Sequence, residues 1–233
     1  MKKLFAGLAV AGSLFMNAQE KAQSSSPITF GVKAGFNAST LSRTNDHDGD
    51  FQDDEDKMKA GFHAGVFVNI PVAQKFSIQP ELLFTQLGAK TEERFSYTYN
   101  NTTYRKNADY KTNLNYLVLP VVVQYNILPQ LYVEAGPEFG LLLGGKSKGD
   151  ETQSSKTGSV VVTTTESFSE KLPMDFYNRF NFGIGMGAGY YFTQNFAVTA
   201  RFTAGITNIL KNADDGYKVR NNALQIGVAY KFK

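Results

Sequence analysis

The sequence contains neither cysteine nor tryptophan in its 233 residues. The absence of cysteine excludes a disulfide scaffold, a thiolate metal site, a cysteine nucleophile and a lipid-modified N-terminal cysteine. Charge is also sparse, since charged residues make up 19% of the chain and the formal net charge is +3. So small a charge does not indicate a nucleic-acid partner. We therefore expect no nucleic-acid binding, and no motif indicates a cofactor.

Long apolar runs are missing as well. After the N-terminus, no stretch approaches the ~18 consecutive apolar residues of a membrane-spanning helix. The mean hydropathy of -0.27 is ordinary for a soluble protein. Composition thus excludes membrane helices and, taken alone, favours a soluble globular chain that is long enough to bury a core.

The N-terminus has the three parts of a secretory signal peptide. Lys2 and Lys3 precede an apolar run over residues 4–16, and Ala18 is a small residue placed for cleavage. The alternative is an N-terminal helix of the mature fold, but the run has no polar second face and is too short to span a membrane. We therefore predict a cleaved signal peptide over 1–18, a flexible polar lead-in over 19–27 and one folded domain over 28–233.

From Ile28 onward, apolar and polar residues alternate with the period of a β-strand. The clearest case is residues 180–192, where large apolar residues alternate with asparagine and glycine. In residues 110–125 both faces are equally apolar, so the orientation of that strand stays open. The eight alternating segments are 28–39, 59–70, 75–85, 110–125, 131–143, 180–192, 196–206 and 224–232.

Short and long connections alternate between these segments. The short ones are 71–74, 126–130 and 193–195, and the long ones are 42–58, 89–109, 146–175 and 211–219. An even strand number with all long connections at one end is typical of a transmembrane barrel with short periplasmic turns and longer external loops. The predicted fold is therefore all-β, an antiparallel eight-stranded up-and-down transmembrane β-barrel. A soluble lipocalin-like barrel is the alternative, and it would have an apolar interior and a polar exterior.

The charged residues of the predicted strands share the glycine-rich face. A mid-membrane Arg or Lys on the lipid side costs ~2–4 kcal/mol, so this face is expected to line the lumen. Counted along the strands, four of these residues fall at similar depth and predict an internal ionic and hydrogen-bonded cluster that plugs the lumen: Lys33, Glu81, Glu134 and Arg201. Glu138 and Arg179 are assigned to the same structural set. Scattered charges in a wide, wet lumen are the alternative.

The sequence resembles the PorT-like outer membrane β-barrel family of Gram-negative bacteria. The resemblance rests on residues 31–37 (GVKAGFN), 114–125, 135–140, 183–190 and 225–232, in that order. It implies an outer membrane barrel and, for the eponymous members, a part in protein secretion. The chain departs from the usual pattern at its end, because Lys233 follows the aromatic Phe232 that barrel-assembly machinery would recognise.

The first long connection partly matches a calcium-binding loop. Asp46, Asp48, Asp50 and Glu55 occupy ligand positions of the twelve-residue pattern, but Thr44 stands where the first carboxylate belongs. No flanking helices are evident, so a solvated acidic loop is the competing interpretation.

No catalytic array is visible, and we expect no enzyme activity. The chain has two histidines, His47 and His63, and His63 is placed on the lumen face as a packed or water-bonded side chain. Residues 97–104 and 146–175 are candidates for hairpins that project outside the membrane. Their exposed strand edges could pair with a partner, or they could be surface loops that tolerate sequence change and have no binding role.

Taken together, these patterns predict an exported protein of the outer membrane of a Gram-negative bacterium. We expect a structural or interaction role, in membrane stabilisation, adhesion, assembly or secretion. A narrow porin-like channel for small solutes is the alternative. The expected partners are outer membrane lipid and lipopolysaccharide, the barrel-assembly machinery during biogenesis, and a protein bound through the external loops.

Overall fold

The computed structural model describes residues 27–44, 55–211 and 216–232. The predicted signal peptide and all of the lead-in except Pro27 lie outside the described residues. The elements are β1 (Thr29–Thr44), β2 (Glu55–Lys57), β3 (Lys59–Pro71), β4 (Phe76–Tyr99), β5 (Thr102–Asn126), β6 (Leu131–Thr157), β7 (Val160–Lys171), the 3-10 turn η1 (Met174–Phe176), β8 (Phe180–Tyr191), β9 (Phe196–Gly205) and β10 (Lys218–Lys231).

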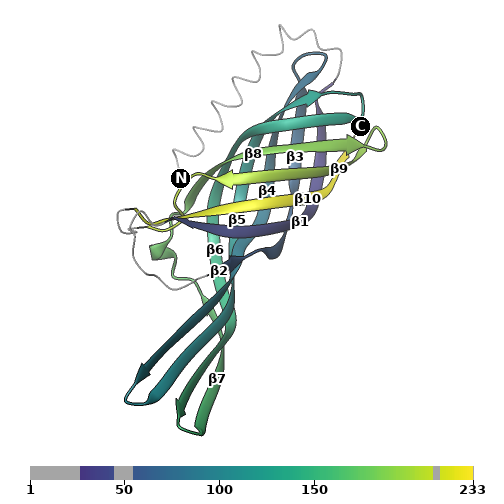
Figure 1. Ribbon diagram of the computed structural model, residues 1–233. Coiled ribbons are helices and arrows are strands. Elements are labelled where there is room, and N and C mark those ends of the chain that lie inside the picture. Colours follow the sequence, from purple (N-terminus) through teal and green to yellow (C-terminus); the bar gives the residue numbers. More distant parts are fainter. Residues whose placement is uncertain (1–26, 45–54, 212–215, 233) are drawn as a thin grey trace.

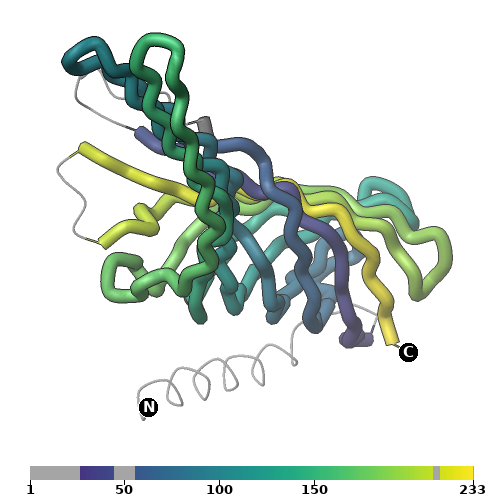
Figure 2. The backbone as a smooth tube through the Cα atoms, turned by 90° about the horizontal axis from the view of Figure 1, so that it is seen from below, coloured from purple at the N-terminus to yellow at the C-terminus, as the bar shows by residue number. Residues whose placement is uncertain are grey.

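Eight of these strands form a closed antiparallel ring (Figures 1 and 2). The order around the ring is β1, β3, β4, β5, β6, β8, β9 and β10, and β10 pairs with β1 from Gly31↔Lys231 to Thr44↔Lys218. The predicted eight-stranded antiparallel barrel is confirmed. A closed ring leaves no unpaired strand edge in hydrocarbon, which is why it can stand in a membrane.

In the described residues no helix is long and apolar enough to cross a bilayer.

Side chains alternate between a lipid-facing exterior and a filled interior. Phe36, Met186 and Ile226 are at least half exposed on the outside, whereas Lys33 and Arg201 are almost wholly buried inside. Polar inside and apolar outside is the reverse of a soluble lipocalin-like barrel, so that alternative is wrong. The alternation also explains the low mean hydropathy, because the mean over the chain combines outward apolar residues with inward polar ones.

The orientation of residues 110–125 is now fixed. Tyr116, Val118 and Val122 are buried in the lumen, and Leu119 and Val123 face outward. The strand looked equally apolar on both faces because the part of the lumen that Tyr116 and Val118 enter is itself apolar.

Two of the predicted long connections are largely strand. β4 and β5 continue to a two-residue turn at Asn100 and Asn101, both with positive φ, as a tight hairpin turn requires. β6 and β7 meet at Gly158, also with positive φ. The predicted strands therefore ended too early near 85, 110 and 143, because the extensions carry charged or polar residues on both faces and no apolar face packed against a core. The projecting hairpins are confirmed.

The two hairpins make one external sheet. β5 and β6 stay paired out to Thr102↔Thr157, so β4, β5, β6 and β7 run side by side beyond the ring, as Figure 1 shows at its lower end. The short turns lie at the opposite end of the barrel. This sheet and the filled lumen are the two features on which function can rest.

Candidate functional site

The centre of the lumen is occupied by four charged side chains from four strands. Glu81 comes from β4, Glu134 from β6, Arg201 from β9 and Lys33 from β1, and each is at most 4% exposed. Glycine makes the room: Gly187 of β8 lies in register between Glu134 and Arg201. A Cβ at that position would collide with the carbonyl oxygen of Ala200 at 2.5 Å and crowd the Arg201 Cβ at 3.2 Å, so glycine there lets β8 and β9 lie close together beside Arg201.

Arg201 holds both carboxylates at once. Its Nη1 and Nη2 donate to Glu81 Oε2 and Oε1 at 2.9 and 2.7 Å, and its Nε donates to Glu134 Oε1 at 2.8 Å. Lys33 Nζ donates to Glu81 Oε1 at 3.3 Å. The four formal charges cancel, which a buried set of charges requires if it is to be tolerated away from water.

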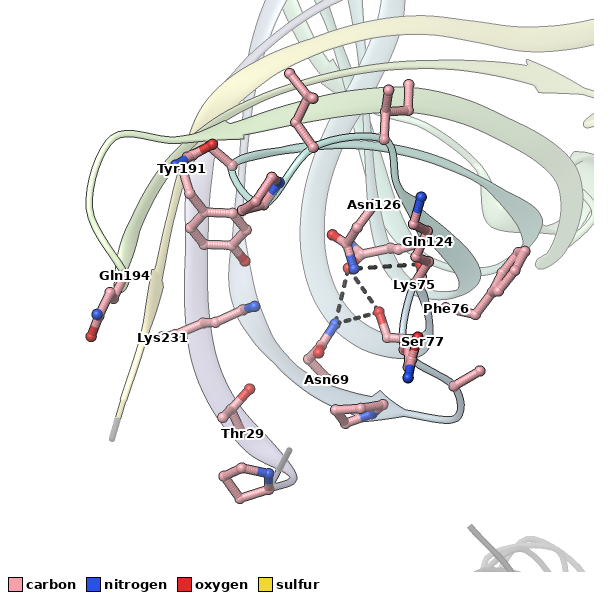
Figure 3. Close-up of a pocket in the computed structure, with 18 of the residues that line it drawn as sticks. Thr29, Asn69, Lys75, Phe76, Ser77, Gln124, Asn126, Tyr191, Gln194 and Lys231 are labelled. Atoms are coloured by element: carbon pink, nitrogen blue, oxygen red, sulfur yellow. Dashed lines mark hydrogen bonds between the residues drawn. The ribbon is translucent and has the colours of Figure 1, made fainter. Parts of the chain in front are cut away.

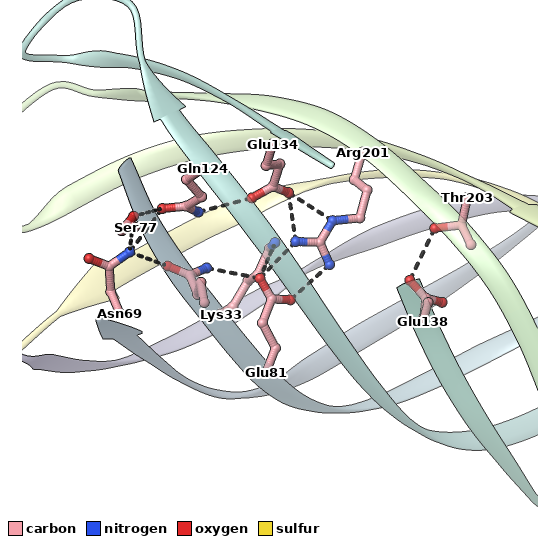
Figure 4. A network of polar contacts seen from close by, with 10 residues as sticks. Lys33, Asn69, Ser77, Glu81, Gln124, Glu134, Glu138, Arg201 and Thr203 are labelled. Atoms are coloured by element: carbon pink, nitrogen blue, oxygen red, sulfur yellow. Dashed lines mark hydrogen bonds and ion pairs between the residues drawn. The ribbon is translucent and has the colours of Figure 1, made fainter. Parts of the chain in front are cut away.

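Side-chain amides extend this cluster toward the short-turn end (Figure 4). Gln79 donates to Glu81 at 2.9 Å, and Gln124 donates to Glu134 at 2.9 Å. Asn69 Nδ2 then donates to the amide oxygens of both glutamines, at 3.1 and 2.9 Å. The contacts form a circuit through both carboxylates and Arg201, so each carboxylate is held from two sides and the cluster is rigid.

Of the six residues assigned to this set from the sequence, four lie in the cluster, one lies beside it and one lies elsewhere. Glu138 is buried, but it accepts from Thr203, whose hydroxyl donates at 3.1 Å. The assignment of Arg179 was wrong, because this residue is exposed. It lies before the first residue of β8, so the alternation had been extended past the end of the strand.

Toward the external end the lumen changes from ionic to neutral polar contacts. Asn37 Nδ2 donates to Thr85 Oγ1 at 2.8 Å, and Asn37 Oδ1 lies 2.7 Å from His63 Nδ1. Because the amide oxygen can only accept, the His63 proton is on Nδ1. His63 is thus a buried lumen residue, as the alternation predicted.

An apolar cluster closes the external mouth. It is built from inward residues of the barrel and from Ile209, which follows β9 and is 2% exposed. Asn178 fixes this segment by donating to the carbonyl oxygens of Asn208 and Leu210, both at 3.0 Å. The members are Leu87, Leu114, Tyr116, Val118, Leu142, Ile209, Val219 and Ala223. The lumen is therefore filled by an ionic layer and an apolar layer in series.

The sequence interpretation missed this apolar layer and the amide circuit. Gln79, Gln124 and Asn69 stand on polar faces, so alternation alone could have added them to the cluster. Ile209 carries no such signal, because it lies in a connection and is buried only through long-range packing.

The candidate calcium residues Asp46, Asp48 and Asp50 lie outside the described residues, as does His47. Glu55 is the first residue of β2, which pairs with β4. In the part of the chain that is described, no three carboxylate or histidine side chains form a metal-binding group.

The external sheet has two chemically different faces. Phe95, Tyr97 and Tyr104 lie on one face, where the Tyr97 and Tyr104 rings stack with centroids 5.0 Å apart. On the other face Arg94 pairs with Asp109 at 2.9 Å. These three aromatic residues are 38–49% exposed, and leaving so much apolar surface in contact with water is energetically unfavourable.

Comparison with solved structures finds small barrels at low identity. The attachment invasion locus protein Ail of Yersinia pestis, solved with the heparin analogue sucrose octasulfate, is 14% identical over 89% of this chain and 100% of that chain, with a TM-score of 0.43. Neisserial surface protein A is 13% identical over 89% and 100%, with a TM-score of 0.42. OprG from Pseudomonas aeruginosa is 15% identical over 88% and 95%, with a TM-score of 0.36.

No curated protein matches the chain. The family described as outer membrane protein beta-barrel domain matches residues 17–211. The chain therefore belongs to this family of outer membrane barrels, whose place is the outer membrane of Gram-negative bacteria.

Proposed function

We propose that this protein is a closed, non-conducting outer membrane barrel that presents its external sheet to a partner at the cell surface. The observation that carries the proposal is that four strands continue beyond the barrel while its lumen is filled. The lumen holds the ionic layer around Arg201 and the apolar layer that contains Ile209. A barrel evolved for transport would keep a continuous wet path, whereas this one uses Arg201 to bind two carboxylates across its lumen.

The edge of the external sheet supports an interaction role. β7 pairs with β6 on one side, and in the described residues it has no strand on its other side. Residues 160–165 (VVVTTT) carry no charge and have β-branched side chains throughout. An uncharged β-branched edge can accept an added strand from a partner through main-chain hydrogen bonds. The partner is proposed to be a protein, and adhesion, assembly and the secretion role of PorT-like members are forms that this binding could take.

The remaining expected partners follow from the barrel surface. The outward Phe, Ile and Leu side chains are suited to lipid and to the acyl chains of lipopolysaccharide. Recognition by the barrel-assembly machinery during biogenesis is part of the proposal. Export through a cleaved signal peptide over residues 1–18 remains part of the proposal. We propose no catalytic role, since His63 is buried in the lumen and bonded to Asn37.

A photo-reactive side chain at single positions tests the interaction role in intact cells. One variant carries it at Tyr97 in the external sheet, one at Val161 on the β7 edge, and a control carries it at Phe36 in the lipid-facing band. Discrete protein adducts from the two external positions, with only lipid adducts from Phe36, are expected. An absence of protein adducts at both external positions would contradict the proposal.

A narrow channel is the second candidate, and one observation favours it. A cavity at the short-turn end reaches inward to Asn69, Ser77 and Gln124. For solutes to pass, the contacts between Arg201 and the two carboxylates would have to break, and the side chains of the apolar layer would have to move aside. Swelling of liposomes in small sugars distinguishes the two candidates: the closed barrel gives no swelling above empty liposomes, and a channel gives swelling that depends on sugar size.

A further inference from the structure

The cavity at the short-turn end has a volume of about 980 Å³ and a chemically distinct lining. It lies between the turns that join β3 to β4, β5 to β6 and β8 to β9, and the lumen network forms its floor through Asn69, Ser77 and Gln124 (Figure 3). Short turns face the periplasm in outer membrane barrels, so this cavity is accessible from that side.

The lining carries positive charge without a matching acid. Lys75 and Lys231 are its charged residues, and none of the described residues that line it is acidic. Lys231 extends into the cavity opposite Asn69 and Ser77, and its Nζ lies 4.3 Å from the centroid of the Tyr191 ring (Figure 3). The ring face stabilises the ammonium in part, but a partly buried cation is best compensated by an anion.

The backbone of Lys231 is fixed by two hydrogen bonds, and its ammonium lies against the Tyr191 ring. Lys231 N donates to Asn195 O at 2.8 Å, and Asn195 Nδ2 donates to Lys231 O at 2.7 Å. The last residue of β10 is thereby tied to the turn before β9. Tyr191, the residue under the ammonium, is itself packed against Tyr132, with ring centroids 5.8 Å apart.

The rest of the lining matches a peptide. A side-chain amide both donates and accepts, as a peptide group does, and the cavity has six of them: Asn69, Gln74, Gln124, Asn126, Gln130 and Gln194. Ile127, Leu128 and Phe192 add apolar surface. Among the described residues that line the cavity, both cations are lysines and none is an arginine. An ammonium pairs with a carboxylate as a point charge, whereas the planar fork that holds a phosphate through two parallel hydrogen bonds is supplied by arginine.

We propose that this cavity binds the carboxylate end of a short peptide from the periplasmic side. Lys231 pairs with the terminal carboxylate. The amides of the turn residues Gln74, Gln130 and Gln194 bond the adjoining peptide groups, because those of Asn69 and Gln124 are already bonded within the lumen network. This site is separate from the external sheet, so it stands or falls independently of the interaction role proposed above.

Calorimetric titration of the purified full-length protein in detergent tests the site. The probes are acetyl-trialanine with a free carboxylate, the same peptide with a terminal carboxamide, and inorganic phosphate. We expect saturable binding of the free acid, with affinity for the carboxamide and for phosphate lower by at least about tenfold. Lys231→Gln should weaken binding of the acid by at least about tenfold. Lys148→Gln, which removes an exposed charge in the external sheet, should leave it unchanged.

Several outcomes would overturn the site. These are equal binding of acid and carboxamide, equal binding by wild type and Lys231→Gln, phosphate binding as tight as peptide binding, and no saturation by about 10 mM peptide. The shift in gel mobility on heating reports whether each variant is folded. If Lys231→Gln does not fold, the comparison of acid with carboxamide on the wild-type protein still decides the question.

Discussion

At the scale of single residues, Arg201 is the side chain on which the lumen depends. It joins the carboxylates of β4 and β6 from β9, with four short contacts within a region that is almost fully buried. Glu81 retains a second partner in Lys33, whereas the cationic partner of Glu134 is Arg201. This asymmetry lets the charge balance be tested by substitution.

Arg201→Met should lower the free energy of unfolding by about 3–5 kcal/mol, because it leaves Glu134 as a buried charge without a cation. Combining Arg201→Met with Glu134→Gln restores neutrality, since the Lys33–Glu81 pair remains. The free energy of unfolding of this double variant should fall by less than that of the single variant. Urea titration of the protein folded into lipid vesicles measures both. A single variant within about 1 kcal/mol of wild type would show that the cluster contributes little to stability.

Glu92 in the external sheet is expected to give a pH-dependent contact. Hydrogen bonds donated by Lys57 and Lys90, both at 2.8 Å, hold the pKa of Glu92 at about 2, below its ordinary value of 4.5. A lowered carboxyl pKa stabilises the fold above the ordinary value, and this contribution is lost as the pH falls from about 4.5 toward 2. The amide protection factors of β2 should therefore fall across this range.

Glu92→Gln provides the control for this titration. Its β2 protection factors should be lower than those of wild type at pH 6 and should change little between about pH 5 and pH 2.5. Equal pH dependence in wild type and variant would assign the effect to another group.

At the scale of elements, the long β4–β5 pair joins the barrel to the external sheet. Gly88 lies near the level where β4 leaves the ring, with φ of 124° and its carbonyl oxygen accepting from Ser39 Oγ at 2.9 Å. A Cβ at this position would collide with the carbonyl oxygen of Thr112, its neighbour on β5. Glycine is therefore required here both by the backbone conformation and by the strand contact.

Gly88→Ala should lower the free energy of unfolding by about 1–3 kcal/mol, because it adds left-handed strain and pushes β4 from β5. Gly144→Ala is the matched control, since a Cβ there meets nothing within 4 Å. It should stay within about 0.5 kcal/mol of wild type in the same urea titration. If the two alanine variants were equally stable, the close contact at Gly88 would not limit the fold.

At the scale of the whole molecule, the chain combines a filled membrane barrel with a β-sheet that stands beyond it. The alternation of residues predicts the ring and its polar interior, because lipid demands an apolar exterior all around it. Depth counting placed Lys33, Glu81, Glu134 and Arg201 together, since strand rise is regular.

Other features could not be predicted, for physical reasons. The external extensions of β4 to β7 have no apolar face against a core, so they lack the signal that marks a half-buried strand. Ile209 is buried through packing between residues far apart in the chain. Arg179 was misplaced because alternation by itself does not show where a strand begins.

Conductance of the purified wild-type protein in a planar lipid bilayer tests the central claim, that the lumen is closed, most directly. With the ionic layer and the apolar layer both in place, the membrane should show no sustained current above that of the protein-free bilayer at moderate voltage. Stable, uniform current steps from the wild-type protein would contradict a closed lumen and identify the barrel as a channel.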